Sequence, residues 1–338
     1  MTSSDRLARM LSGEAVDRLL CMPILMIWAA QDAGVSYADY VRDYRVLGDC
    51  QVRLLEQFPL DVAQLISDPY RETADAGAEL QYYDDGPPRC LRPLLRERAA
   101  LATLQTPDPL AGGRMTDRVQ GAAYLKAHLG ADVPIMGWVE GPIALAVDLR
   151  GMTELMLDLV DDRAFVRDLC DWATDLEIAF ARAQVEAGCS IIGIGDAAAS
   201  LVSAADYREL VLPGEQRLVQ AIHQAGATAR LHICGNTTHL LSLMPLTGCD
   251  IIDLDHLVPI EQARGAMGDD VAILGNFDPV AALLRATPEE VKVWCRRCHE
   301  ACGVRHIIGP GCEVPPGTPR ANIMAMCEYA REASLPRG

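Results

Sequence analysis

The chain has 338 residues, of which 50% are hydrophobic, and it is long enough to form the core of one large barrel or of two small domains. Its formal net charge of −17 argues against a nucleic-acid partner, because binding to phosphates needs clustered Lys and Arg side chains. Residues 1–20 lack the features of a signal peptide, and no apolar run approaches the ~20 residues that span a bilayer. We therefore expect a cytoplasmic protein, without membrane segments, whose 12 scattered cysteines are reduced.

Eight short apolar runs alternate with longer segments of helical period along the chain. Most of the runs are apolar on both faces, which is typical of strands in a parallel sheet that is covered by helices. The predicted strands cover residues 19–27, 61–67, 133–139, 190–195, 227–233, 250–255, 270–276 and 304–310.

Three long segments between these strands have helical character, namely 152–188, 204–226 and 288–303. Thr287 is placed to cap the last of them and Gly303 to end it. Eight strands that alternate with helices predict an α/β fold of the (β/α)₈ TIM-barrel type.

A doubly wound open sheet is the alternative, but its glycine-rich phosphate turn is matched only weakly by GIGDAAAS at 193–200. We predict a single domain over residues 1–338, with a helical extension before the first strand. The stretch from about 68 to 115 is predicted to be an insertion of turns and short strands after the second strand.

The active sites of TIM barrels lie at the carboxyl ends of the strands. Chemically active side chains follow strands three to eight of the prediction, and we expect them to gather at one end of the barrel. They are Glu140, Asp196, His232, Cys234, Asp253, Asp255, Asn276 and Cys312.

Three of these side chains suit a zinc ion. His232 and Cys234 alternate at a strand end, so both point to the same face, and Cys312 lies in a turn rich in Gly and Pro. Zinc takes imidazole and thiolate ligands, and catalytic sites keep a fourth position open. The other interpretation is a core histidine beside buried cysteines, and the spacing alone leaves both open.

Four segments carry a resemblance to a known family: HICGNTTHLL (232–241), DIIDLDHLVPIEQAR (250–264), ILGNFDPVAAL (273–283) and GPGCEVPPGTPRANIMAM (309–326). Together they resemble the uroporphyrinogen decarboxylase superfamily, and within it the zinc-dependent corrinoid methyltransferases of the methylcobalamin:coenzyme M type. The resemblance implies that His232, Cys234 and Cys312 are zinc ligands. It also implies methyl transfer between the cobalt of a corrinoid and a small methyl donor or thiol acceptor, with the direction left open.

The resemblance further implies a corrinoid (methylcobalamin) as co-substrate. The chain lacks the Asp-x-His-x-x-Gly motif that would bind a corrinoid, so we expect a separate small corrinoid protein as partner. A homodimer is left open.

The remaining residues at the strand ends are candidates for supporting roles. Asp196 and Asp253 are candidates to orient His232 or to accept protons. Glu140 is a candidate catalytic residue, and either Glu140 or Asp255 is a candidate fourth zinc ligand before substrate arrives. Asn276 is a candidate to bind the cofactor or a polar group of the substrate. The alternative for each is a loop side chain with a purely structural hydrogen bond.

Two other functions remain as alternatives. One is a metal-free decarboxylase of tetrapyrrole carboxylates, which is disfavoured because residues 22–34 contain no basic side chain to hold carboxylates. The other is a carrier of a corrinoid or porphyrin. A second cluster of cysteines, WCRRCHEACG at 294–303, has the spacing of a helix stripe and is predicted to pack on the barrel.

Overall fold

The structure, a computed structural model, describes residues 1–303 and 305–333. Eight parallel strands form one sheet in the order β1-β10-β9-β8-β7-β6-β5-β2. Each predicted strand overlaps one of them, although Val304, which begins the last prediction, lies outside the described residues. The strands are β1 Leu20–Cys21, β2 Ala63–Gln64, β5 Ile135–Glu140, β6 Ile191–Gly195, β7 Thr228–Ile233, β8 Ile251–Leu254, β9 Ala272–Leu274 and β10 His306–Ile308.

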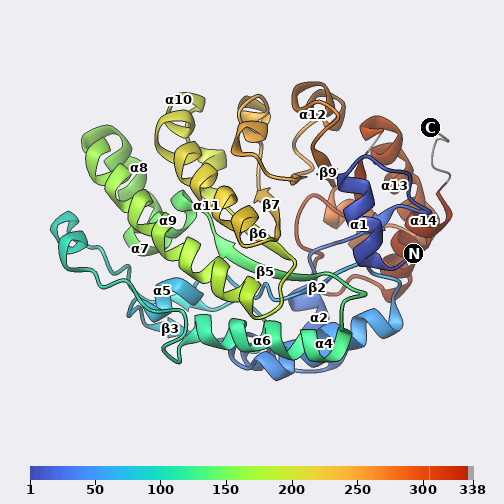
Figure 1. Cartoon of the computed structure of the whole chain (residues 1–338), viewed down its shortest axis with the longest axis horizontal. Helices are drawn as coiled ribbons and strands as arrows, with labels where there is room; N and C mark the ends of the chain where they lie inside the picture. Colours follow the sequence, from blue (N-terminus) through green and yellow to red (C-terminus); the bar gives the residue numbers. More distant parts are fainter. Residues whose placement is uncertain (304, 334–338) are drawn as a thin grey trace.

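Helices cover the outside of this sheet, and Figure 1 shows α6, α9 and α11 beside strands β5 to β7. The α-helices are α1 Ser3–Leu11, α2 Ile27–Ala33, α3 Tyr37–Arg42, α4 Tyr44–Gln57, α5 Arg71–Asp75, α6 Arg114–Leu129, α7 Pro142–Arg150, α8 Met152–Asp161, α9 Arg163–Glu186, α10 Ala204–Asp206, α11 Leu212–Gln224, α12 Ile260–Met267, α13 Pro288–Cys302 and α14 Arg320–Glu332. Shorter 3₁₀ or π turns are η1 Arg98–Thr103, η2 Ala197–Leu201, η3 Tyr207–Val211, η4 Thr238–Leu240, η5 Met244–Thr247 and η6 Val280–Leu284. The arrangement is a TIM-type α/β barrel, as predicted.

Asp61, just before β2, bonds the edge strand β2 to the other edge strand, β1. The backbone N–H of Asp61 donates to the carbonyl of Cys21 at 3.0 Å, and the Asp61 carboxylate accepts the N–H of Cys21 at 2.9 Å. The same carboxylate accepts hydrogen bonds from Arg6 of α1 at 3.2 Å and from Arg18 at 2.7 Å. The predicted N-terminal helical extension is therefore bonded to the seam of the barrel.

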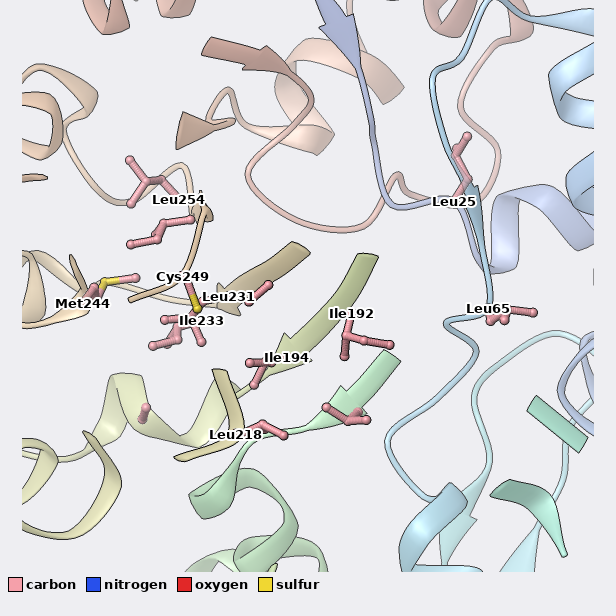
Figure 2. Close-up of a cluster of buried hydrophobic side chains, with 14 of the residues drawn as sticks. Leu25, Leu65, Ile192, Ile194, Leu218, Leu231, Ile233, Met244, Cys249 and Leu254 are labelled. Atoms are coloured by element: carbon pink, nitrogen blue, oxygen red, sulfur yellow. The ribbon is translucent and has the colours of Figure 1, made fainter. Parts of the chain in front are cut away.

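Side chains alternate between the two faces of the sheet, because successive residues of a strand point in opposite directions. An inner cluster fills the barrel, and α1 contributes Leu7 and Met10 to it. An outer cluster lies between the strands and the helices, and Figure 2 shows part of it. The outer residues labelled there are Leu25, Leu65, Ile192, Ile194, Leu218, Leu231, Ile233, Met244, Cys249 and Leu254.

Three local predictions can be compared with the structure. Residues 152–188 form two helices, α8 and α9, because the chain leaves the helical conformation at Asp162, which instead caps α9. Thr287 caps α13 in a reciprocal capping box with Glu290, and Gly303 ends that helix, as predicted. The insertion after β2 contains α5, the antiparallel pair β3 (Leu80–Gln81) and β4 (Arg89–Cys90), and η1.

Candidate metal and substrate site

The end of β7 directs three polar side chains into the barrel. Arg230, His232 and Cys234 alternate with Leu231 and Ile233, which belong to the outer cluster. Arg230 is fully buried and His232 is 6% exposed. The sequence of this strand therefore brings a guanidinium, an imidazole and a thiol to one face.

The loop after β10 brings a second thiol to the same place. A Cβ on Gly311 would lie 2.4 Å from the backbone nitrogen of His256, so the absence of a side chain lets this loop approach the end of β8. The Sγ of Cys312 then lies 3.3 Å from the Sγ of Cys234 and 3.9 Å from Nε2 of His232. Nε2 of His232 lies 2.9 Å from the Sγ of Cys234.

The structure thus brings together the three residues that the sequence analysis proposed as zinc ligands. Their ligand atoms all lie within 4.8 Å of one another. One imidazole nitrogen and two sulfurs are a donor set that suits zinc and leaves a fourth position for another ligand. The residues present therefore fit the proposed metal.

Asp253 lies directly behind the imidazole. Its carboxylate is 3.0 Å from Nδ1 of His232 and accepts hydrogen bonds from Arg230 at 2.7 to 3.0 Å. Burial would raise the pKa of Asp253, but the Arg230 charge and the bond to His232 lower it. The carboxylate therefore stays charged, and it fixes Nδ1 as a proton donor so that Nε2 is turned toward the thiols.

The two thiols share one negative charge. The hydrogen bond from Cys234, together with the nearby His232, lowers the pKa of Cys312 to about 4 despite burial. The same contact with Cys312, followed by burial, raises the pKa of Cys234. For His232, burial acts against protonation, but the bonds to Asp253 and Cys312 raise its pKa to about 9. Without a metal, Cys312 is therefore the charged thiol, and binding of a metal ion would release the protons that His232 and Cys234 hold.

A pocket of about 180 Å³ lies beside the three residues. Its wall is mainly apolar, and the indole of Trp138 forms part of it. A Cβ on Gly193 or Gly195 would lie 2.2 or 2.9 Å from that indole, so two glycines on β6 make room for it. The other apolar side chains of the wall are Ile24, Met26, Ile66, Pro69 and Ala197.

Glu140 lies at the end of β5 and lines this pocket, as expected from its position. Its carboxylate accepts a hydrogen bond from the buried Arg71 at 2.8 Å. Burial nevertheless raises the pKa of Glu140 to about 8, and the neighbouring Glu72 adds to this effect. Glu140 can therefore carry or release a proton near neutral pH.

Asp196 lies away from the pocket. It follows Ile192 and Ile194 on the outer face of β6, and its Oδ1 accepts the N–H of Ala144 in the first turn of α7 at 2.7 Å. Burial raises the pKa of Asp196, and Glu215 raises it further. Its position is that of a helix-capping side chain, 0% exposed, with no contact to His232 through its carboxylate.

Asn276 and Asp255 hold the loop after β8. The Asn276 amide donates to the carbonyls of Asp255 at 3.0 Å and Val258 at 2.6 Å. The Asp255 carboxylate accepts the N–H groups of Gly235 and Leu257, each at 2.9 Å. Neither side chain lines the pocket beside His232.

Sequence reasoning missed two carboxylates and one arginine. Asp68 and Glu313 line the pocket, and Arg71 lies behind Glu140. Glu313 directly follows Cys312, so its position beside a proposed ligand was the available signal. Asp68 and Arg71 come from the segment after β2, whose path the sequence pattern did not indicate.

The cysteine stripe at 294–303 forms part of α13, as predicted. Cys295, Cys298 and Cys302 are buried on one face of this helix, and burial raises the pKa of each thiol. Within residues 1–303 and 305–333, only His232, Cys234 and Cys312 form a cluster that could hold a metal through three such side chains.

A protein-family model described as uroporphyrinogen decarboxylase (URO-D) matches residues 2–333. The chain belongs to this family.

Relatives with different names occur among the similar URO-D family proteins. The methylcobamide:CoM methyltransferase MtbA of Methanosarcina mazei is 35% identical over 221 residues, which cover 65% of this chain and 64% of that protein. The uroporphyrinogen decarboxylase of Thioalkalivibrio sulfidiphilus is 28% identical, and the alignment covers 98% of both chains. The chain therefore matches less than two thirds of the length of the more similar relative.

A solved structure shares the fold of this URO-D family chain. A methyltransferase from Methanosarcina mazei superposes with a TM-score of 0.90 at 24% identity and covers 98% of this chain and 99% of that one. In the described part of the chain, none of the helices is both long enough and apolar enough to span a membrane.

Proposed function

We propose that this URO-D family protein is a zinc-dependent corrinoid methyltransferase, which moves a methyl group between a small molecule and the cobalt of a corrinoid. The observation that carries the proposal is the convergence of His232, Cys234 and Cys312 beside an apolar pocket, with Asp253 behind the imidazole. The similarity to the methylcobamide:CoM methyltransferase MtbA supports it. A separate small corrinoid protein is the proposed partner, in the cytoplasm.

The side chains of the chain have distinct tasks in this proposal. His232, Cys234 and Cys312 would hold zinc, which when bound lowers the pKa of a substrate thiol and keeps its sulfur as a nucleophilic thiolate. Asp253 orients His232 and keeps Nε2 free to bind. The apolar wall around Trp138 excludes water from the reacting group, and it favours an uncharged methyl group there.

Glu140 has a proton-handling task. The residue lines the pocket, and its pKa of about 8 means that it is mostly protonated at neutral pH and exchanges a proton with the substrate more readily as the pH rises toward 8. Arg71 holds the carboxylate in place from behind at 2.8 Å. Asp196 and Asn276 have structural roles in this proposal. Asp196 caps α7, and Asn276 holds the loop after β8.

A decarboxylase of tetrapyrrole carboxylates is the competing function, and the full-length relative from Thioalkalivibrio sulfidiphilus has that name. The described residues that line the pocket include Asp68, Glu140 and Glu313 but neither Lys nor Arg. A substrate with many carboxylates would find no lining cation to bind them, so the pocket favours the methyltransferase.

The proposal is tested by following the loss of methylcobalamin absorbance with zinc-loaded protein and a panel of thiols and methylated compounds. We expect methyl transfer with at least one of them, and none above background with Cys234→Ala. Cys298→Ala removes a thiol from α13 and is the matched control, which should retain activity. Equal rates for wild type and Cys234→Ala would contradict the proposal.

A further inference from the structure

The pocket beside His232 has an unusual balance of charge. Three carboxylates line it, those of Asp68, Glu140 and Glu313, while no described lining residue is Lys or Arg. The chain as a whole is also acidic, with a formal net charge of −17. A small molecule that enters this pocket therefore approaches through an acidic surface and finds carboxyl groups but no lining Lys or Arg in the wall.

Two of the three carboxylates have an arginine partner. The Asp68 carboxylate accepts two hydrogen bonds from Arg114, each at 2.7 Å. Glu140 accepts a hydrogen bond from the fully buried Arg71 at 2.8 Å. Their charges are thus largely balanced within the protein.

Glu313 differs from both. The structure gives it no ion pair with any Lys, Arg or His among residues 1–303 and 305–333. Its Oε1 accepts the N–H of Ile27 at 2.9 Å, and the N–H of Met26 also contributes, at the start of α2. These two backbone donors are therefore already bonded to Glu313. A carboxylate has about four acceptor sites, so further sites remain for a ligand.

We propose that Glu313 selects a substrate that carries a positive charge, namely a small thiol or methylated sulfur compound with an ammonium group. The inference rests on the proposed function, because it places the reacting sulfur at His232, Cys234 and Cys312. The ammonium group then lies within the same pocket, next to a carboxylate that has no ion pair among the described residues, and the indole of Trp138 lines the same pocket. A sulfonate or carboxylate at that place would be disfavoured.

The experiment uses three thiols of equal chain length with zinc-loaded wild-type protein and methylcobalamin. They are 2-aminoethanethiol, 2-mercaptoethanol and 2-mercaptoethanesulfonate, which carry a positive, a zero and a negative charge. We measure kcat/KM for each, and we measure binding to the zinc-loaded protein by calorimetry. The same series is run with Glu313→Gln, which keeps the size and the acceptor oxygen, and with Glu186→Gln, which removes an exposed charge elsewhere.

We expect wild type to prefer the aminothiol over the sulfonate, in both kcat/KM and binding. Glu313→Gln should reduce this preference by about 10-fold or more, because a charge within a few ångströms of the ammonium is lost. Glu186→Gln should leave the preference unchanged. Comparing variant with wild type for the same pair of thiols cancels the different intrinsic reactivities of the thiols.

Two results overturn the inference in different ways. Methyl transfer with a preference for the sulfonate, or with no preference, rejects the role of Glu313 but leaves the proposed function intact. Neither turnover nor binding of any of the three thiols rejects the role of Glu313, and it rejects the proposed function as well when no compound of the wider panel of thiols and methylated compounds supports methyl transfer. The wild-type series distinguishes these two results even if Glu313→Gln fails to fold.

Discussion

Two regions of this barrel contain histidine and cysteine side chains, and they differ in what those side chains can do. At the carboxyl end of β7, Nε2 of His232 faces two thiols while Asp253 bonds Nδ1. In the second region, the thiols of α13 and the side chain of His306 in β10 are buried, and none of residues 1–303 and 305–333 gives them a carboxylate partner. Burial is the main cause that lowers the pKa of His306 to about 3, whereas Asp253 keeps that of His232 at about 9.

The two regions differ in whether their side chains point to one position and in whether a carboxylate orients the histidine. The cysteines of α13 follow a helix stripe, so they face the barrel side by side and stabilise its outer core. Cys234 and Cys312 come from two different loops and meet face to face. A metal needs ligands that converge on one point, together with a partner that orients the imidazole, and only the first region has both.

The largest effect is expected from removing a thiol in each region. Cys234→Ala should lose metal and should reduce methyl transfer by more than the roughly 100-fold that follows loss of an outer hydrogen-bond partner. Cys295→Ala should keep metal and activity and should lower the free energy of unfolding by about 1 kcal/mol through lost packing. Metal analysis, the methylcobalamin assay and urea denaturation measure these three quantities. Equal metal loss in both variants would remove the distinction between the regions.

Asp253→Asn tests the contact between the Asp253 carboxylate and Nδ1 of His232. Metal affinity should fall roughly 10- to 100-fold, because the amide orients His232 less strongly than a carboxylate. The free energy of unfolding should fall by roughly 3 to 5 kcal/mol, since the buried Arg230 loses its counter-charge. Competition with a chelator measures the affinity.

Asp250→Asn is the matched control for that variant. Asp250 directly precedes β8 and bonds His223 at 2.9 Å, far along the strand from the thiols. Its loss should leave metal affinity unchanged. A similar loss of affinity in both variants would mean that Asp253 acts through overall charge and not through His232.

His306→Gln probes the second region through pH. Because burial lowers the pKa of His306 to about 3, the native state binds fewer protons than the unfolded chain between about pH 3 and the ordinary histidine value of 6.5. Stability therefore rises with pH in this window. Between pH 6.5 and 5, wild type should lose about 2 kcal/mol more than the variant. Parallel losses in urea denaturation would show that His306 is protonated in the native state.

The smallest effect is expected at the start of α13. Thr287→Ala removes the capping hydroxyl and should lower the free energy of unfolding by about 1 kcal/mol. Thr287→Ser keeps a hydroxyl and should retain most of the stability that the cap contributes. Neither variant should change metal content. A loss of metal in Thr287→Ala would show that α13 and the site at β7 are coupled.

Much of the site could be predicted from the sequence because strands alternate. Period-two alternation puts His232, Cys234 and Asp253 on the inner face, and strand order puts their ends at one rim. The same rule explains why Asp196 faces outward, since Ile192 and Ile194 occupy its face. The position at a strand end did not by itself predict which carboxylates point into the barrel, as Asp253 does, and which point outward, as Asp196 does.

The remaining features depend on contacts between distant segments. Glu140 and Arg71 are 69 residues apart, and their bond follows from how the insertion after β2 folds back on β5. Glu313 faces the pocket because the loop after β10 approaches two elements: the start of α2, where Glu313 bonds Ile27, and the end of β8, where Gly311 leaves room for the backbone. Such approaches are set by the packing of whole elements, which local patterns in the sequence do not specify.

The most direct test of the metal site is the zinc content of purified protein, measured by elemental analysis for wild type, Cys312→Ala and Cys298→Ala prepared without chelator. We predict about one zinc per chain in wild type and in Cys298→Ala, and a clear loss in Cys312→Ala. No zinc in wild type, with none taken up when zinc is added, would contradict the metal site and the proposed function with it.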